Sequence, residues 1–392
     1  MAWMRMMGTD SVAYHRATVI DRADDHPGQA LAYYASRGET PLVWGGSGAA
    51  ALGLVGTVGD DQYEAIYGPG GAKDPTTGVV LTRTRRPGME LVIAAHKSVA
   101  ELGVIGRAED MHLILDAERD ATLAYLDGLT RLRGGRRGTA AVATPTEGLV
   151  YAVTRHATSR AGDPAPHDHV LIANLVRMRD ERGGAKAADT SLWREHLHAA
   201  TMHGRMASAR VAVELGYGIV RDDGPSGRLG HWAIAGVAEE AIAVHSKRAA
   251  DISAEAERQG RDTYRARNVI ARDTRSRKRH EPIGDLLARW EAELRSVGLP
   301  PAELARSIDE ARGQTRPRVE AKDIVAMALA PDGPLAARKV FSRRHVVVAV
   351  APALFGRDPA ELAEVVKATL THPESVPLLA TPMARERVYA TA

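Results

Sequence analysis

Residues 155–175 read R-H-A-T-S-R-A-G-D-P-A-P-H-D-H-V-L-I-A-N-L and combine two strand-like segments with three histidines. His167 and His169 are two residues apart, so on a strand both imidazoles point to the same face. His156 lies near the end of the preceding strand-like segment, 149–157, and the glycine and prolines in between favour a loop. If the two strands pair as a hairpin, all three imidazoles reach one pocket.

Three neutral imidazoles would give a metal ion three nitrogen ligands and leave positions open for water and substrate oxygens. A lone H-x-H spacing also occurs by chance, and the third histidine on the adjacent strand is what favours metal binding. The chain has no cysteine, so any metal must be held by His, Asp or Glu. We expect a divalent ion, Mg or Mn first, with Zn, Ni and Co as alternatives.

The first 240 residues mix strand-like and helix-like segments. Residue spacing predicts helices over 108–133 and 193–215, and strands over 79–84, 89–95, 149–157, 167–176 and 228–235. From about residue 237 the chain becomes polar, charged and helical, with prolines dividing it into short helices. We therefore predict a first domain over 1–240, a basic helical extension over 241–300, and a small helical region, or the root of a truncated domain, over 301–392.

Bulk composition is that of a soluble globular protein, with 44% hydrophobic and 26% charged residues in a chain of 392. The first eight residues lack the apolar core of a signal peptide. The longest apolar run, near 345–355, is too short to span a bilayer. These features predict a cytoplasmic protein without membrane insertion, and we expect a monomer.

The sequence contains no G-x-x-x-x-G-K-[ST] loop, so we predict no nucleotide site of this type.

The histidine block resembles the three-histidine motif of conjugative relaxases of the MobF class, which belong to the HUH endonucleases. Three further segments agree in order and rough spacing. Residues 33–54 are similar to a tyrosine pair followed by W-x-G-x-G-A-x-x-L-G-L, residues 90–98 (E-L-V-I-A-A-H-K-S) to D-L-T-F-S-x-P-K-S, and residues 192–219 to a long helix that ends in E-L-G-Y-x-I. The resemblance covers about residues 1–240.

This resemblance implies a two-layer α+β fold, in which an antiparallel sheet of palm type carries the histidines and helices flank it. It implies an enzyme that nicks one strand at a transfer origin, stays attached to the 5′ end through a phosphotyrosine, and later rejoins the ends. Single-stranded and hairpin origin DNA would be the substrate, and a coupling protein and the type IV secretion machinery would be partners.

Two residues depart from the family pattern. Glu90 stands where the family usually has an aspartate that orients a metal-binding histidine, and a glutamate can do so with one extra methylene. His96 stands where the family has a proline before K-S. Either change can alter the geometry of the site without changing its chemistry.

The nucleophile is expected among three tyrosines, because a phenolate both attacks phosphorus and leaves again. Tyr14 occupies the position of the family's first tyrosine, shortly after the first strand, and is preferred. Tyr33 and Tyr34 match the family's second tyrosine cluster and would serve a second transfer step, unless they only pack on a helix.

DNA affinity should come from Lys and Arg on phosphates. Lys97, in the matched K-S motif, is the candidate for the scissile region. Residues 245–280 carry eleven Lys or Arg against five Asp or Glu and could clamp DNA, although a charged cluster is often only a solvated face. The remaining phosphate candidates are the clustered arginines Arg83, Arg85, Arg86, Arg131, Arg133, Arg136 and Arg137.

Three other functions compete with a relaxase. A rolling-circle replication initiator would use the same histidines and tyrosine, but such proteins are usually smaller and lack the W-x-G-x-G-A stretch. A metal-dependent hydrolase of small molecules would turn over without a covalent DNA adduct. A non-catalytic DNA-binding module with a structural metal would bind its hairpin and never cut it.

Overall fold

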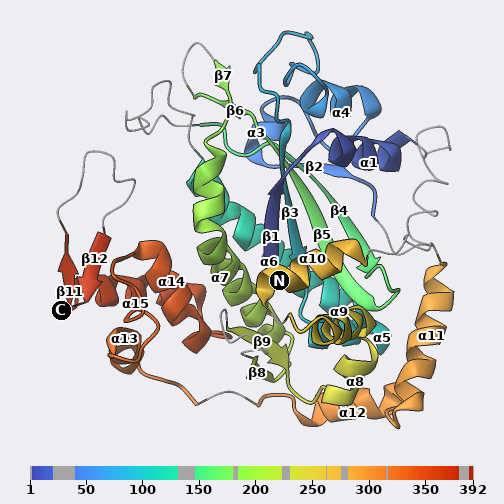
Figure 1. Cartoon of the computed structure of the whole chain (residues 1–392), viewed down its shortest axis with the longest axis vertical. Helices are drawn as coiled ribbons and strands as arrows, with labels where there is room; N and C mark the ends of the chain where they lie inside the picture. The colour runs from blue at the N-terminus through green and yellow to red at the C-terminus, as the bar shows by residue number, and fades with distance from the viewer. Residues whose placement is uncertain are drawn as a thin grey trace.

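The computed structural model describes residues 2–20, 40–130, 146–179, 184–222, 230–261, 263–274, 281–314, 317–378 and 388–391. Its centre is a five-stranded antiparallel sheet in the order β1-β3-β5-β4-β2 (Figure 1). The strands are β1 (Ala2–Met6), β3 (Gly88–Ala94), β5 (Pro164–Ala173), β4 (Tyr151–Thr158) and β2 (Val43–Gly45). The antiparallel α+β fold and the hairpin that joins β4 to β5 are confirmed.

One face of the sheet is apolar and packs on two long helices, α6 (Ala108–Gly128) and α7 (Thr190–Glu214) (Figure 1). Leu91 and Ile93 of β3 and Ile172 of β5 point to this face and are fully buried. Burying each such side chain is worth about 1.5–3 kcal/mol, so this layer fixes how the sheet sits on the helices. The residues between them must point to the opposite face.

The opposite face is covered at one end by α3 (Ser47–Ala50) and α4 (Asp60–Tyr67). The Trp44 ring stacks on Tyr67 with 6.0 Å between ring centroids, and the Tyr67 hydroxyl donates to the Leu171 carbonyl at 2.6 Å. Gly46 has a φ of 91°, and a Cβ there would lie 2.2 Å from the Leu149 carbonyl oxygen. The glycines of the W-x-G-x-G-A motif therefore permit close backbone packing beside the sheet. The other end of this face carries the histidines.

Helix α1 (Thr9–Ile20) crosses the sheet next to α4 and is anchored to it by side chains. The Arg16 guanidinium contacts Asp60 at 3.0 Å and Glu64 at 2.6 Å. The Tyr63 hydroxyl donates to the Val12 carbonyl at 3.0 Å. These contacts set the position of α1 beside α4, from where its His15 reaches Glu90 and His169.

A second large core joins α7 to α5 (Lys97–Val104) and to the helices of the C-terminal part of the chain. These helices are α8 (Glu239–Val244), α9 (Lys247–Arg258), α10 (Tyr264–Asp273), α11 (Ile283–Ser296), α12 (Pro301–Glu310), α13 (Ala321–Leu329), α14 (Arg343–Val350) and α15 (Pro359–Thr371), with a 3-10 turn η1 (Ala351–Ala353). Helices α14 and α15 pack on α7, and α13 packs on α14 and α15 (Figure 1). Helices α8, α11 and α12 lie at the far end of the sheet. Two short hairpins also occur, β6 (Val176–Arg177) with β7 (Ala185–Lys186), and β8 (Ile219–Asp222) with β9 (His231–Ile234).

Two expectations for secondary structure are wrong. Residues 79–84 form no strand, because only an isolated bridge between Lys73 and Val80 pairs this segment, and Val79 is 62% exposed. The region over 301–392 is not purely helical, because a small sheet forms there from β10 (Phe341–Ser342), β12 (Val388–Thr391) and β11 (Ser375–Pro377). The domain boundaries placed near 240 and 300 stay predictions.

Candidate metal centre and nucleophile

The hairpin of β4 and β5 brings the three predicted histidines together. His156 pairs directly with His167 across the hairpin, and His169 follows on the same face of β5. One ring nitrogen from each of the three lies within 4.8 Å of the others. Ring centroids are 5.3 Å apart for His156 and His167, 4.8 Å for His156 and His169, and 5.0 Å for His167 and His169. The sequence spacing therefore predicted the grouping, and metal binding by it stays a prediction.

Hydrogen bonds fix the tautomers of two of these rings. Nδ1 of His169 lies 2.7 Å from Oε1 of Glu90, and Nδ1 of His167 lies 2.7 Å from the Ala165 carbonyl oxygen. A carbonyl or an ionised carboxylate can only accept, so both rings must donate from Nδ1. In a neutral ring that donates from Nδ1, Nε2 carries the lone pair, which is the form in which imidazole binds a cation. The residues present thus fit a divalent metal ion.

Glu90, the acid predicted to orient this site, is completely buried. Its Oε2 accepts from the Arg5 guanidinium at 2.5 Å, and the Ser11 hydroxyl lies 3.4 Å away. Burial raises the pKa of Glu90, but its interactions with His15 and His169 outweigh burial and hold the pKa well below its ordinary range. The glutamate therefore reaches His169 as the family's aspartate is expected to, with its charge balanced by Arg5.

Replacing Glu90 with glutamine should weaken Mn²⁺ binding by about 10- to 100-fold, because the partner that orients His169 loses its charge. Isothermal titration of the metal into the variant measures the change. Glu118→Gln is a matched control, because Glu118 is also buried but lies on α6, behind the sheet. Equal affinities for Glu90→Gln and the unchanged protein would contradict this role for Glu90.

His15 joins the site from α1, and sequence analysis did not assign it a role. Its side chain is 2% exposed, and its Nε2 lies 3.5 Å from Oε1 of Glu90. Its ring centroid is 5.6 Å from that of His169. Burial lowers the pKa of His15, which favours the neutral imidazole. His15, Glu90 and His169 form a second group whose ligand atoms lie within 4.8 Å of one another.

Tyr14 is the residue before His15, and its ring lies 5.1 Å from the His15 ring in an edge-on arrangement. The His15 ring therefore lies near both the Tyr14 ring and the His169 ring. The Tyr14 side chain is 47% exposed, so a bulky substrate can reach it. Tyr33 and Tyr34 lie outside the described residues. The choice of Tyr14 as nucleophile stays a prediction.

Asp168, between two of the site histidines, points to the opposite face of the sheet and supports it from behind. Its carboxylate is fully buried and accepts two hydrogen bonds of 2.7 Å from the Arg155 guanidinium. Arg155 also contacts Asp116 of α6 at 2.8 Å, and Arg119 of α6 lies 3.5 Å from Asp168. This ion-pair network ties the histidine hairpin to α6.

Arg155→Ala should lower the free energy of unfolding by about 3–5 kcal/mol, because it leaves the buried Asp168 without its main partner. Urea unfolding followed by circular dichroism measures the loss. Arg210→Ala removes an exposed ion pair with Glu214 and should change stability by less than about 1 kcal/mol. A loss for Arg155→Ala as small as that of the control would show that the network contributes little.

The structure gives Lys97 two protein partners. Its Nζ donates to the Pro164 carbonyl at 2.9 Å and to the His245 carbonyl at 2.7 Å. Burial lowers the pKa of Lys97. The ammonium thus ties the start of β5 to the end of α8, and its predicted contact with DNA at the scissile region stays a prediction.

The described arginine candidates lie far from the histidines. Arg83, Arg85 and Arg86 are exposed and come just before β3. β3 begins opposite Ala173, whereas its Val92 pairs with His169. Four residues of strand separate the two ends, which is about 13 Å. These arginines could therefore contact only DNA outside the metal site. The other four candidates lie outside the described residues: Arg131, Arg133, Arg136 and Arg137.

No helix in the described ranges is long and apolar enough to cross a membrane.

Comparison with known proteins gives one family and consistent relatives. The family model described as TrwC relaxase matches residues 9–297. Multifunctional conjugation protein TraI of Escherichia coli is 31% identical over 268 residues, which is 65% of this chain and 14% of that protein. This chain therefore matches only a small part of its curated relative.

Solved structures share the fold. A structure of conjugative relaxase TrwC in complex with oriT DNA, with copper bound, superposes with a TM-score of 0.62 at 23% identity, and covers 77% of this chain and 100% of that chain. TrwC with a 27-mer DNA comprising the recognition hairpin and the cleavage site gives a TM-score of 0.59 at 21% identity, with the same coverage. At these identities the likeness establishes the α+β architecture.

Proposed function

This chain belongs to the TrwC relaxase family, and from that premise we propose that it nicks one strand of a transfer-origin DNA through Tyr14, with a divalent cation held by His156, His167 and His169. The observation that carries the proposal is the grouping of three imidazoles beside α1, the helix that presents an exposed tyrosine. Neither the histidines nor the tyrosine alone would favour this chemistry over hydrolysis or simple DNA binding.

The proposed reaction is a transesterification. Oη of Tyr14 attacks the scissile phosphorus, the bond from phosphorus to the 3′ oxygen breaks, and a 5′-phosphotyrosine and a free 3′ hydroxyl result. The phenol loses its proton and the leaving 3′ oxygen gains one. A bound divalent cation would act as a Lewis acid on a phosphate oxygen and offset the developing charge. The reverse attack by a 3′ hydroxyl releases Tyr14 and rejoins the strand.

The chain's own residues prepare this step in three ways. Glu90 and the Ala165 carbonyl hold His169 and His167 in the tautomers that carry the lone pair on Nε2. The Arg5 guanidinium donates to Glu90 and balances the negative charge of this buried carboxylate. The contacts of Arg16 with α4 anchor the helix that carries Tyr14. Each group is in place before substrate arrives, which lowers the cost of reaching the transition state.

The substrate we propose is single-stranded and hairpin origin DNA, and a solved TrwC complex contains a 27-mer DNA that comprises the recognition hairpin and the cleavage site. A coupling protein and the type IV secretion machinery as partners, and a monomeric state, remain part of the proposal. For the cation we propose Mg or Mn, with Zn, Ni and Co as alternatives, because imidazole ligands accept all the later first-row ions.

A denaturing gel tests the proposal. The protein is incubated with labelled single-stranded oligonucleotides tiled over the DNA that flanks its gene, with Mn²⁺ or Mg²⁺, and parallel samples contain a chelator. We expect one oligonucleotide to give a band that migrates with the protein, survives denaturant and is absent after chelation. If no oligonucleotide gave such a band with Mn²⁺ or Mg²⁺, or in repeats with Zn²⁺, Ni²⁺ and Co²⁺, nicking by this chain would be ruled out.

A further inference from the structure

Trp3 stands apart from the other tryptophans of the chain. It lies on β1, at the edge of the sheet, and is 40% exposed. All five tryptophans lie among the described residues, and the other four, Trp44, Trp193, Trp232 and Trp290, are between 1% and 7% exposed. An exposed indole gives up the large gain from burying an aromatic ring, and it offers a flat apolar surface with a polar edge to a ligand.

The strand register places Trp3 on the histidine face of the sheet. Trp3 pairs with Val92 of β3, and Val92 pairs with His169 of β5. Directly paired residues point to the same face, so these three residues form one row across neighbouring strands. Strands lie about 4.8 Å apart, which puts the backbone of Trp3 about 10 Å from that of His169.

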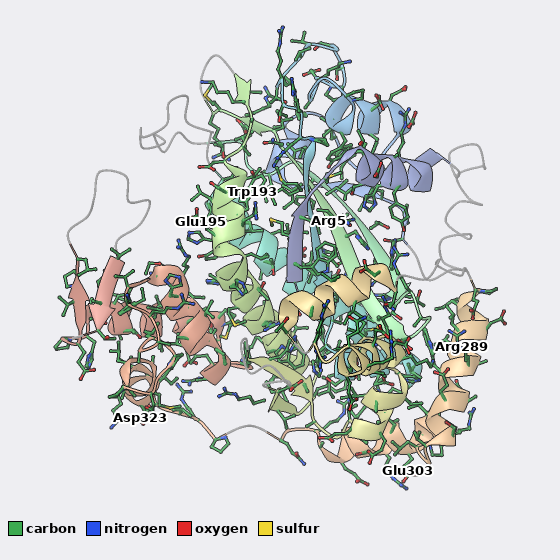
Figure 2. All side chains as sticks on the ribbon, in the orientation of Figure 1. Arg5, Trp193, Glu195, Arg289, Glu303 and Asp323 are labelled. Carbon is green, nitrogen blue, oxygen red and sulfur yellow. The ribbon has the colours of Figure 1, made fainter. Side chains whose placement is uncertain are left out.

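Arg5 completes the arrangement. Its guanidinium carbon lies 5.4 Å from the centroid of the Trp3 ring, a distance typical of a cation–π contact. The same guanidinium is held at 2.5 Å by Glu90, the carboxylate that contacts His169. Figure 2 shows Arg5 on β1 at the centre of the molecule. The indole is therefore held by a fixed cation and linked through it to the metal centre.

We propose that Trp3 and Arg5 form a stacking platform for one unpaired base of single-stranded DNA, two or three nucleotides from the scissile phosphate. The proposal rests on the proposed nicking activity. Aromatic side chains stack on bases of any sequence, and an adjacent arginine adds favourable charge near the backbone. The distance of about 10 Å corresponds to roughly three nucleotides at the 3.4 Å rise of stacked DNA. A duplex would not bind in this way, because its bases already stack on their neighbours.

Tryptophan fluorescence reports on this platform directly, because Trp3 is the exposed indole. We expect a single-stranded oligonucleotide to quench the emission in the presence of a chelator, when no cleavage occurs, and the same sequence as a duplex not to do so. Trp3→Phe should remove the quenching while keeping most of the affinity, because a phenyl ring still stacks. Trp3→Ala should weaken binding roughly 5- to 150-fold, as measured by fluorescence anisotropy of a labelled oligonucleotide.

Leu113→Ala is the matched control, because Leu113 is 46% exposed on α6, behind the sheet, and should leave the affinity unchanged. Quenching that persists in Trp3→Phe, or an affinity of Trp3→Ala within twofold of the unchanged protein, would overturn the platform. The denaturing gel separates the two proposals. Normal nicking with no effect of Trp3→Ala rejects the platform alone, whereas quenching without any covalent adduct upholds the platform and rejects the nicking activity.

Discussion

Replacing Tyr14 with phenylalanine should abolish the covalent adduct between the protein and its single-stranded substrate. The variant lacks only the oxygen that would bond to phosphorus, and removing a nucleophile costs on the order of 10⁶ in rate in well-studied enzymes. The ring itself stays on the surface of α1, 47% exposed in the unchanged protein, so folding should not suffer. The denaturing gel with Mn²⁺ measures the adduct, and anisotropy measures binding.

Tyr389→Phe provides the control, because Tyr389 lies in β12, far along the chain, and stacks on Phe341. We expect it to form the adduct at the normal rate. An undiminished adduct in Tyr14→Phe would reject Tyr14 and move the assignment to Tyr33 or Tyr34. In that event the double variant of those two residues should lose the adduct.

His167→Ala should lower the rate of cleavage by about 10³-fold and leave DNA affinity largely intact. The imidazole is one of three nitrogen donors, and loss of metal-ion catalysis costs several kcal/mol, where each 1.4 kcal/mol is a factor of ten. Binding draws on positive side chains spread over the surface, so it should depend little on this ring. Single-turnover cleavage with Mn²⁺ and anisotropy with a chelator measure the two effects separately.

The matched control is His372→Ala, because His372 follows α15 and lies outside the cluster. Its cleavage rate should equal that of the unchanged protein. A parallel loss of cleavage and binding in His167→Ala would instead mean that the histidines hold the fold together. Thermal unfolding of the variant distinguishes these outcomes, because a structural site would lower the melting temperature as well.

Local patterns in the sequence were enough to predict the histidine hairpin. The H-x-H spacing sets both rings on one face, and the turn residues between the strands fix the pairing, so three imidazoles meet within a stretch of fourteen residues. Glu90 was predicted from the resemblance, and its 2.7 Å contact with His169 supports that role. The hairpin depends on residues that are close in sequence, and the contact of Glu90 with His169 depends on the antiparallel pairing of neighbouring strands.

His15 could not be predicted in the same way, because its place depends on how α1 is anchored. The ion pairs of Arg16 with Asp60 and Glu64 connect residues 44 and 48 positions apart. Residues 79–84 were misread for a related reason, since alternating β-branched residues form a strand only where another strand offers hydrogen bonds. The K-S motif predicted a DNA contact for Lys97 but not its hydrogen bonds to the carbonyls of Pro164 and His245, because those residues lie far from it in the sequence.

The bend of the histidine hairpin depends on a helix encoded much later in the chain. Arg289 and the Trp290 indole, both on α11, each donate to the carbonyl of Gly162 at 2.8 Å (Figure 2 labels Arg289). A fragment that stopped at residue 240 would lack both donors, and the bend would keep only local contacts such as those of the Ser159 hydroxyl with Ala161 and Asp163, together with the bond from Lys97 to the Pro164 carbonyl. Shortened versions or fusions meant to keep the metal pocket rigid should therefore retain the chain through at least Ser296, where α11 ends.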